Sequence, residues 1–148
     1  MRIFVDGDAC PVKDETYRVA GRYNLKVVVV SNASLFVPQS DLIEMVVVKG
    51  RFDAADDWIV ENIEPGDIAI TSDIPLAERC LARGARVIGP KGHAFTDENI
   101  GEAMGTRALM DMLRQSGTMT GGPAPFAKAD RSRFLQALDE ALVRLKRR

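Results

Sequence analysis

The sequence contains the stretch Lys26-Val27-Val28-Val29-Val30-Ser31, in which four valines follow one another without a polar residue. A strand with one face in water alternates apolar and polar residues, whereas this run predicts a strand that is buried on both faces. Such strands are typical of parallel sheets that are covered by helices on both sides. The valine run therefore predicts an α/β protein.

Four further apolar runs have the length of strands, and they lie at residues 2–6, 45–48, 67–71 and 86–88. Segments with helical features lie between or after these strands, at residues 11–22, 53–62, 73–83, 97–115 and from 130 onward. This alternation predicts a three-layer α/β/α fold with a mainly parallel sheet of roughly five strands and right-handed crossovers. Because the sequence contains no stretch typical of an interdomain linker, residues 1–148 are expected to form a single domain.

Helix boundaries follow from capping residues. Pro11 suits the first turn of the first helix, Asp53 is a candidate N-cap, Asp73 is a candidate N-cap, and Gly84 stands where a C-cap glycine belongs. Together these signals predict where three of the helices begin or end.

The last third of the chain has weaker signals. Thr96 or Asp97 is expected to cap the fourth helix, and Asp130 the last one. An inward stripe is expected in the fourth helix at Ile100, Met104, Ala108 and Met112, and in the last at Phe134, Leu135, Leu138, Leu142 and Leu145. Residues 117–127 are rich in Gly and Pro and predict a loop that acts as a lid or clasp.

Composition limits the class of protein. The chain has 148 residues, 46% of them hydrophobic and 28% charged, which is typical of a globular protein with a core. No apolar run approaches the roughly 20 residues that a membrane helix needs, and the early Asp6 argues against a secretory signal, so we expect a cytoplasmic protein. Cys10 and Cys80 have no metal-binding spacing and are expected to be reduced thiols.

Charge is distributed unevenly although the formal net charge is only −1. Residues 1–73 carry 7 Lys and Arg against 13 Asp and Glu, whereas residues 128–148 carry 7 against 3. This pattern is consistent with an ion site beside a contact to a phosphate backbone. A solvated basic face on the last helix explains it more simply, since charged ends are common on such helices.

Three acidic clusters are the main indication of function. They are Asp6 and Asp8 after the first strand, then Asp53, Asp56 and Asp57, then Asp73 after the fourth strand. The carboxyl ends of parallel strands meet at one edge of the sheet, where ligands bind in open α/β proteins. Carboxylates gathered there repel one another unless a cation neutralises them, and oxygen ligands suit Mg²⁺.

Each cluster also has a structural explanation. Asp6-Gly7 is a common turn signal, Asp53 is a plausible helix cap with acidic neighbours favoured by the helix dipole, and Asp73 is a plausible cap. The sequence leaves both explanations open.

Other polar residues are expected at the same edge of the sheet. Lys13, Thr71, Ser72 and Lys91 are candidate contacts to a phosphate. Cys10 begins a helix, a position that can lower the pKa of a thiol. His93 is the only histidine, so no histidine metal cluster exists.

Several motifs together resemble one bacterial family. They are Val5-Asp6-Gly7-Asp8-Ala9-Cys10-Pro11-Val12-Lys13, Phe52-Asp53-Ala54-Ala55-Asp56-Asp57, Ile70-Thr71-Ser72-Asp73-Ile74-Pro75-Leu76-Ala77 and Thr120-Gly121-Gly122-Pro123. They resemble the YaiI/YqxD family of small bacterial proteins of uncharacterised function. The resemblance implies a PIN-like fold, whose nuclease members gather acidic residues around Mg²⁺ or Mn²⁺. It places Asp6, Asp8, Asp56 or Asp57, and Asp73 in that acidic site.

These observations predict a nuclease that depends on Mg²⁺ or Mn²⁺ and hydrolyses phosphodiester bonds, with RNA as the expected substrate. Asp6, Asp8 and Asp73 are the expected catalytic residues, and Asp6, Asp8, Asp56, Asp57 and Asp73 the expected metal ligands. Two alternatives remain: a phosphomonoesterase resembling the haloacid-dehalogenase class, and a non-catalytic module that binds RNA or protein. The phosphomonoesterase would use Asp6 as nucleophile, Asp8 as acid and base, and Ser31 as a phosphate contact. The acidic cluster at 53–57 comes too early in the chain for that class, and the sequence does not give the oligomeric state.

Overall fold

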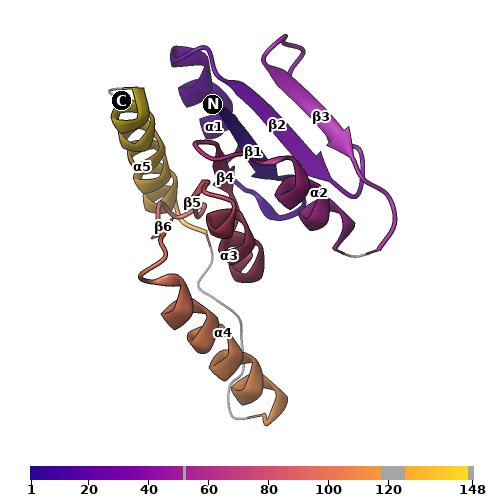
Figure 1. Ribbon diagram of the computed structural model, residues 1–148, viewed down its shortest axis with the longest axis vertical. Coiled ribbons are helices and arrows are strands. Elements are labelled where there is room, and N and C mark those ends of the chain that lie inside the picture. The colour runs from indigo at the N-terminus through magenta and orange to yellow at the C-terminus, as the bar shows by residue number, and fades with distance from the viewer. Residues whose placement is uncertain (52, 118–125, 147–148) are drawn as a thin grey trace.

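A computed structural model describes residues 1–51, 53–117 and 126–146, and it has a mixed sheet with helices on both faces (Figure 1). The strands are β1 (Arg2–Asp6), β2 (Lys26–Ser31), β3 (Ile43–Val47), β4 (Ile68–Ile70), β5 (Arg86–Ile88) and β6 (Ala94–Phe95). The helices are α1 (Lys13–Arg22), α2 (Ala54–Asn62), α3 (Ile74–Ala82), α4 (Ile100–Gln115) and α5 (Lys128–Lys146). The expected three-layer α/β/α architecture is therefore confirmed.

The sheet has the strand order β3-β2-β1-β4-β5-β6. The first five strands run parallel, whereas β6 pairs with β5 in the antiparallel direction. The five strands expected from the sequence are all present. The sixth strand has only two residues, which is too short to produce a periodic pattern.

The core is divided by the sheet into two clusters. Ile3 and Val5 of β1 point to the first cluster, which α1 and α5 cover, and Phe4 points to the second, which α2 and α3 cover. The four valines of β2 divide in the same alternating way, two to each side. The unbroken valine run is thus explained by helices on both faces of the sheet.

The chain changes direction in the sheet between β1 and β4. From β1 it continues outward through β2 and β3, and it then returns to place β4 on the other side of β1. Ligands of open α/β folds bind at such a switch point, beyond the carboxyl ends of the two strands. The residues that follow Val5 and Ile70 therefore occupy the position where a site is expected.

Several local predictions are confirmed and others are wrong. Asp73 caps α3, because its Oδ1 accepts a hydrogen bond of 3.0 Å from the Leu76 N–H, and Gly84 after this helix has a φ of 85°. Asp53 occupies the N-cap position of α2, but its side chain makes no capping hydrogen bond. The first helix begins at Lys13 instead of residue 11, since a short 3₁₀ turn over Gly7–Ala9 precedes it.

The last two helices agree with expectation only in part. Of the two candidate caps of the fourth helix, Thr96 is the one used, since its hydroxyl oxygen accepts a hydrogen bond of 3.2 Å from the Asn99 N–H. Asp130 lies inside α5, where it accepts a bond of 2.8 Å from the N–H of Ala127 just before the helix. The predicted stripe of α4 is wrong beyond its first turns, since Met112 is 63% exposed.

Helix α4 extends away from the sheet and packs against α3, which explains why most of its length stays in solvent (Figure 1). In α5 the expected inward face is confirmed, with Phe134, Leu138 and Leu142 fully buried. The loop expected to act as a lid falls mainly on residues 118–125, which lie outside the described residues. None of the helices in the described ranges is long and apolar enough to cross a membrane.

Candidate functional site

Carboxylates from three segments meet at the switch point between β1 and β4. Asp6 is the last residue of β1, Asp8 follows in the 3₁₀ turn, and Asp73 follows β4. Asp56 reaches the same region from the first turn of α2. The sheet topology thus brings together acidic residues that lie far apart in the sequence.

Asp6 lies at the centre of this group and is only 8% exposed. Burial raises the pKa of Asp6, and the negative charges of Asp73 and Asp8 raise it further. A hydrogen bond of 2.9 Å from the Thr71 hydroxyl to Asp6 Oδ2 acts in the opposite direction. No ion pair to Asp6 is found among the described residues, so its negative charge is disfavoured in the protein as it stands.

Thr71 connects two of the acidic residues. Its hydroxyl donates to Asp6 and accepts a hydrogen bond of 3.0 Å from the backbone N–H of Asp73. Thr71 is only 2% exposed, so this side chain positions the carboxylates and does not present itself to a ligand. Ser72, the next residue, is exposed and retains the surface position that the sequence predicts.

Asp8 is exposed, and β2 holds its carboxylate in place. Its Oδ1 accepts a hydrogen bond from the buried Ser31 hydroxyl, and the N–H of Asn32 lies 3.3 and 3.2 Å from its two oxygens. Gly7 allows this close approach, because a Cβ at that position would lie 3.0 Å from both Val29 Cγ1 and the Val30 carbonyl oxygen. Ser31 therefore orients Asp8, which differs from the phosphate contact expected in the phosphomonoesterase alternative.

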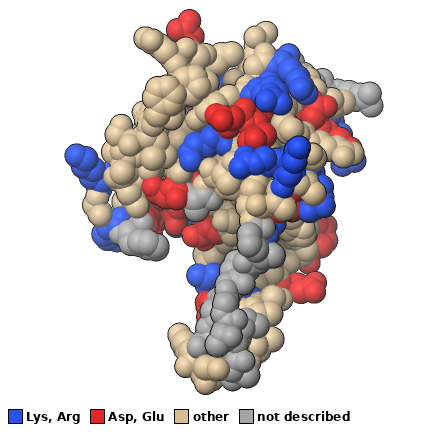
Figure 2. Space-filling model, turned by 180° about the vertical axis from the view of Figure 1, so that it is seen from behind, with Lys and Arg blue, Asp and Glu red and all other residues tan. Residues whose placement is uncertain are grey.

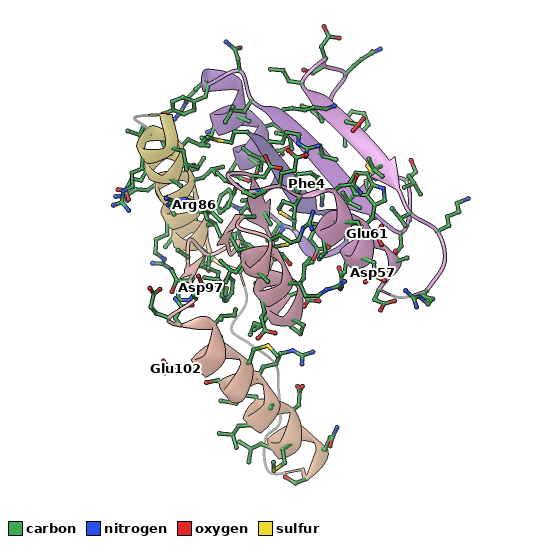
Figure 3. All side chains as sticks on the ribbon, in the orientation of Figure 1. Phe4, Asp57, Glu61, Arg86, Asp97 and Glu102 are labelled. Carbon is green, nitrogen blue, oxygen red and sulfur yellow. The ribbon has the colours of Figure 1, made fainter. Side chains whose placement is uncertain are left out.

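Asp56 and Asp57 are neighbours in the sequence but have different electrostatic environments in the structure. Burial raises the pKa of Asp56 to about 6, and the charges of Asp6 and Asp73 contribute, while Arg79 opposes them. Asp57 instead forms ion pairs of 2.6 Å with Arg51 and 2.9 Å with Arg79, and Figure 3 labels it on α2. Asp56 is therefore electrostatically part of the group around Asp6, whereas Asp57 is neutralised by two arginines.

An Asp56→Asn variant is expected to be more stable than the wild type at pH 7. The pKa of Asp56 is about 6 in the folded protein against an ordinary 3.8, so the folded state binds more protons between these values and stability falls as pH rises through them. Allowing for solvent screening of this half-buried group, the gain at pH 7 should be about 1 kcal/mol. Urea unfolding at pH 7 and at pH 3.5 should show the gain only at the higher pH, and an equal gain at both would contradict this origin.

The donor set matches a hard divalent cation in type and charge. The group consists of carboxylates, which are the ligands that Mg²⁺ and Mn²⁺ prefer, and neighbouring carboxylates disfavour the ionised forms of Asp6 and Asp56. In the parts of the chain that the structure describes, however, no three His, Cys, Asp or Glu side chains are arranged to hold a metal ion. A cation would therefore have to draw the carboxylates closer together.

The two lysines predicted to contact a phosphate, Lys13 and Lys91, have different surroundings. Lys13 donates a hydrogen bond of 3.0 Å to the Cys10 carbonyl oxygen at the start of α1. Lys91 is exposed in the turn after β5, where its charge helps to lower the pKa of Asp130. Cys10 does not have the lowered pKa that the start of a helix can cause, because burial raises the pKa of its thiol to about 11.

Two arginines that the sequence did not single out, Arg51 and Arg79, border the acidic group. Arg79 lies on α3 and reaches α2, so its role depends on the packing of two helices, and no local pattern could have revealed it. The basic residues of α5 are partly paired, for example Arg131 with Glu15 at 3.1 Å. Figure 2, which shows the molecule from behind, has basic and acidic side chains intermingled over this side of the protein.

Comparison with known proteins gives a family but no activity. A model of the family described as "Uncharacterized BCR, YaiI/YqxD family" matches residues 4–144. A UPF0178 protein of Paramagnetospirillum magneticum is 60% identical over 146 residues, which cover 99% of this chain and 97% of that protein. A UPF0178 protein of Rhodospirillum centenum is 58% identical over 151 residues and covers 99% of this chain and 98% of its own length. The similarity therefore extends over essentially the whole chain.

Proposed function

The chain belongs to the YaiI/YqxD family, and we propose that it is a nuclease that depends on Mg²⁺ or Mn²⁺ and hydrolyses phosphodiester bonds, with RNA as substrate. One observation carries this proposal: at the switch point the charges of Asp8 and Asp73 raise the pKa of the buried Asp6, and the charges of Asp6 and Asp73 raise the pKa of Asp56. Gathering ionised carboxylates in this way reduces the stability of the folded protein unless a bound cation neutralises them, which favours a functional role.

Asp6, Asp8, Asp56 and Asp73 would hold the ion. A bound divalent cation supplies an acidified water and neutralises charge on a phosphate. Thr71 would keep Asp6 and Asp73 in fixed orientations, and Ser31 would do the same for Asp8. Asp57 is left out of the proposed ligand set, because Arg51 and Arg79 already neutralise it.

Ser72 and Lys91 remain the proposed contacts to the substrate phosphates, since both are exposed in loops that follow parallel strands. The phosphomonoesterase alternative has less support, because Ser31 is fully buried and donates its hydroxyl hydrogen to Asp8. A non-catalytic module would show base-dependent or protein binding without turnover.

The proposal is tested by incubating a short, labelled single-stranded RNA with the protein and Mn²⁺ or Mg²⁺ at neutral pH. The wild type should cleave the RNA, EDTA should stop the reaction, and Asp56→Asn should lose at least about 10-fold in rate, as residues around metal sites do. Asp41→Asn is the matched control, because Asp41 is exposed near the amino end of β3, at the opposite edge of the sheet.

A generic phosphomonoester is assayed in parallel. Turnover of the monoester without RNA cleavage would contradict the nuclease and favour the alternative enzyme. No turnover of either substrate, combined with no heat of metal binding in calorimetry, would contradict the metal site itself.

A further inference from the structure

A cavity of about 540 Å³ has in its wall Ile74, the residue that follows Asp73 of the acidic group. One wall is formed by Ile74 at the start of α3, another by His93 and Phe95 at β6, and the third by Thr106, Arg107 and Met110 of α4. Its volume is in the range of cavities that bind small organic ligands. The residues of the acidic group do not line this cavity, and two of its lining residues, Ile74 and Phe95, also pack against the second core cluster.

One residue of the cavity wall is the next residue in the sequence after a member of the acidic group. Ile74 follows Asp73, and consecutive Cα atoms are about 3.8 Å apart. Asp73 is fixed by its hydrogen bonds to the backbone of Leu76 and to Thr71. A nucleic-acid strand with a phosphate at the acidic group would therefore have a neighbouring base within reach of the cavity.

Aromatic rings form one side of the cavity. The rings of His93 and Phe95 lie edge to face, with centroids 5.2 Å apart and planes at 86°. The turn that carries them is fixed, since the His93 carbonyl oxygen accepts a bond of 2.7 Å from the Gly89 N–H and Phe95 pairs with Val87 in the sheet. Aromatic side chains on a rigid support are what unpaired bases stack against.

Polar groups at the α4 wall match the edge of a base. Thr106, Arg107 and Glu102 offer donors and acceptors, and Figure 3 labels Glu102 on α4. Asn99 has a different role, because its amide binds the Thr96 N–H at 2.9 Å and the Ala94 carbonyl at 3.0 Å. It fastens β6 to the start of α4 and so keeps the walls of the cavity together.

We propose that this cavity binds a nucleobase of a single-stranded RNA, adjacent to the phosphate that the acidic group would hold. The inference rests on the proposed nuclease function, because the position of the phosphate comes from it. The cavity also supplies an aromatic surface on which a base can stack, and neither the composition nor the order of residues along the chain reveals this surface.

A second copy of the chain is a less suitable occupant. The most exposed apolar residues of α4 are Leu109, at 51%, and Met112, at 63%. With 100° between successive residues of a helix, Met112 points away from the direction shared by Thr106, Arg107 and Met110, whereas Leu109 points to the side. A partner helix on Met112 would leave the cavity empty.

The test measures RNA binding in EDTA, so that it does not depend on metal or on cleavage. A labelled octanucleotide RNA and an abasic oligonucleotide of the same length and charge are compared by fluorescence anisotropy. The wild type should bind the RNA about 10-fold more tightly than the abasic strand, given the usual contribution of one stacked base. His93→Ala and Phe95→Leu should remove most of this difference and leave the affinity for the abasic strand unchanged.

Phe36→Ala is the matched control, because Phe36 is a 92% exposed aromatic residue before β3, outside the cavity. Circular dichroism verifies that the variants are folded, and His93 is exposed, so its loss should not affect folding. Equal binding of the two strands by the wild type, or unchanged discrimination in both variants, would overturn the proposal. So would a dimer, seen by sedimentation velocity, that dissociates in either variant.

The two proposals fail in different ways. Base-dependent binding that requires His93 and Phe95, with no metal-dependent cleavage, would leave the base site standing and refute the nuclease. Metal-dependent cleavage that is insensitive to both variants would do the reverse.

Discussion

An Asp6→Asn variant is expected to lose at least about 100-fold in metal-dependent RNA cleavage without losing stability. Substitution of a residue that only supports the ligands of a metal site already lowers metal affinity or activity by up to about 100-fold, and Asp6 is proposed as a direct ligand. Asparagine keeps an oxygen that accepts the 2.9 Å hydrogen bond from Thr71. It also removes a buried carboxyl group whose raised pKa shows that its ionised form is disfavoured in the folded protein. Cleavage rates, calorimetric Mn²⁺ titration and urea unfolding of the same preparations test both parts of the prediction.

Asp67 provides a matched control for Asp6. It is also a buried aspartate of the sheet region, but it lies at the amino end of β4 and is paired with Arg2 at 3.2 Å. It also accepts hydrogen bonds of 2.9 Å from the N–H groups of Arg2 and Glu64. Asp67→Asn should therefore lose about 1–3 kcal/mol of stability and keep its activity. If both variants lost activity in proportion to stability, the role assigned to Asp6 would be wrong.

Phe134→Ala is expected to have the largest effect on stability, about 3–5 kcal/mol. Phe134 is fully buried in the first core cluster, where it attaches α5 to the sheet. For a chain of this length such a loss lowers the melting temperature by roughly 10 °C. Thermal unfolding followed by circular dichroism measures the effect.

The single tryptophan gives an independent readout of the same variant. Trp58 packs on the opposite face of the sheet, with its ring centroid 6.2 Å from that of Phe4. If the domain unfolds cooperatively, Trp58 fluorescence should report the same midpoint as circular dichroism. Gln136→Ala, at an exposed position of α5, should change stability by no more than about 0.5 kcal/mol. A loss below about 1 kcal/mol in Phe134→Ala would mean that α5 does not pack as described.

Elements with strong local signals were predicted correctly from the sequence. The valines of β2 have no polar neighbour within the strand, so burial on both faces follows directly. Asp73 lies between a strand and a helix, and it caps that helix as expected. Residues 94–95 form a strand only because β5 lies beside them, and Met112 stays in solvent only because α4 leaves the body of the protein. Neither outcome has a local cause.

The sequence by itself determined that acidic residues would stand at the end of β1 and just after β4, because the apolar runs at residues 3–5 and 68–70 end there whatever the tertiary structure is. Only the tertiary structure decided which acids act together. Asp56 and Asp57 are neighbours with the same side chain, yet Arg79 from α3 neutralises Asp57, while Asp56 faces the charges of Asp6 and Asp73. Electrostatic interactions depend on distance in space and on burial, and packing fixes both of these.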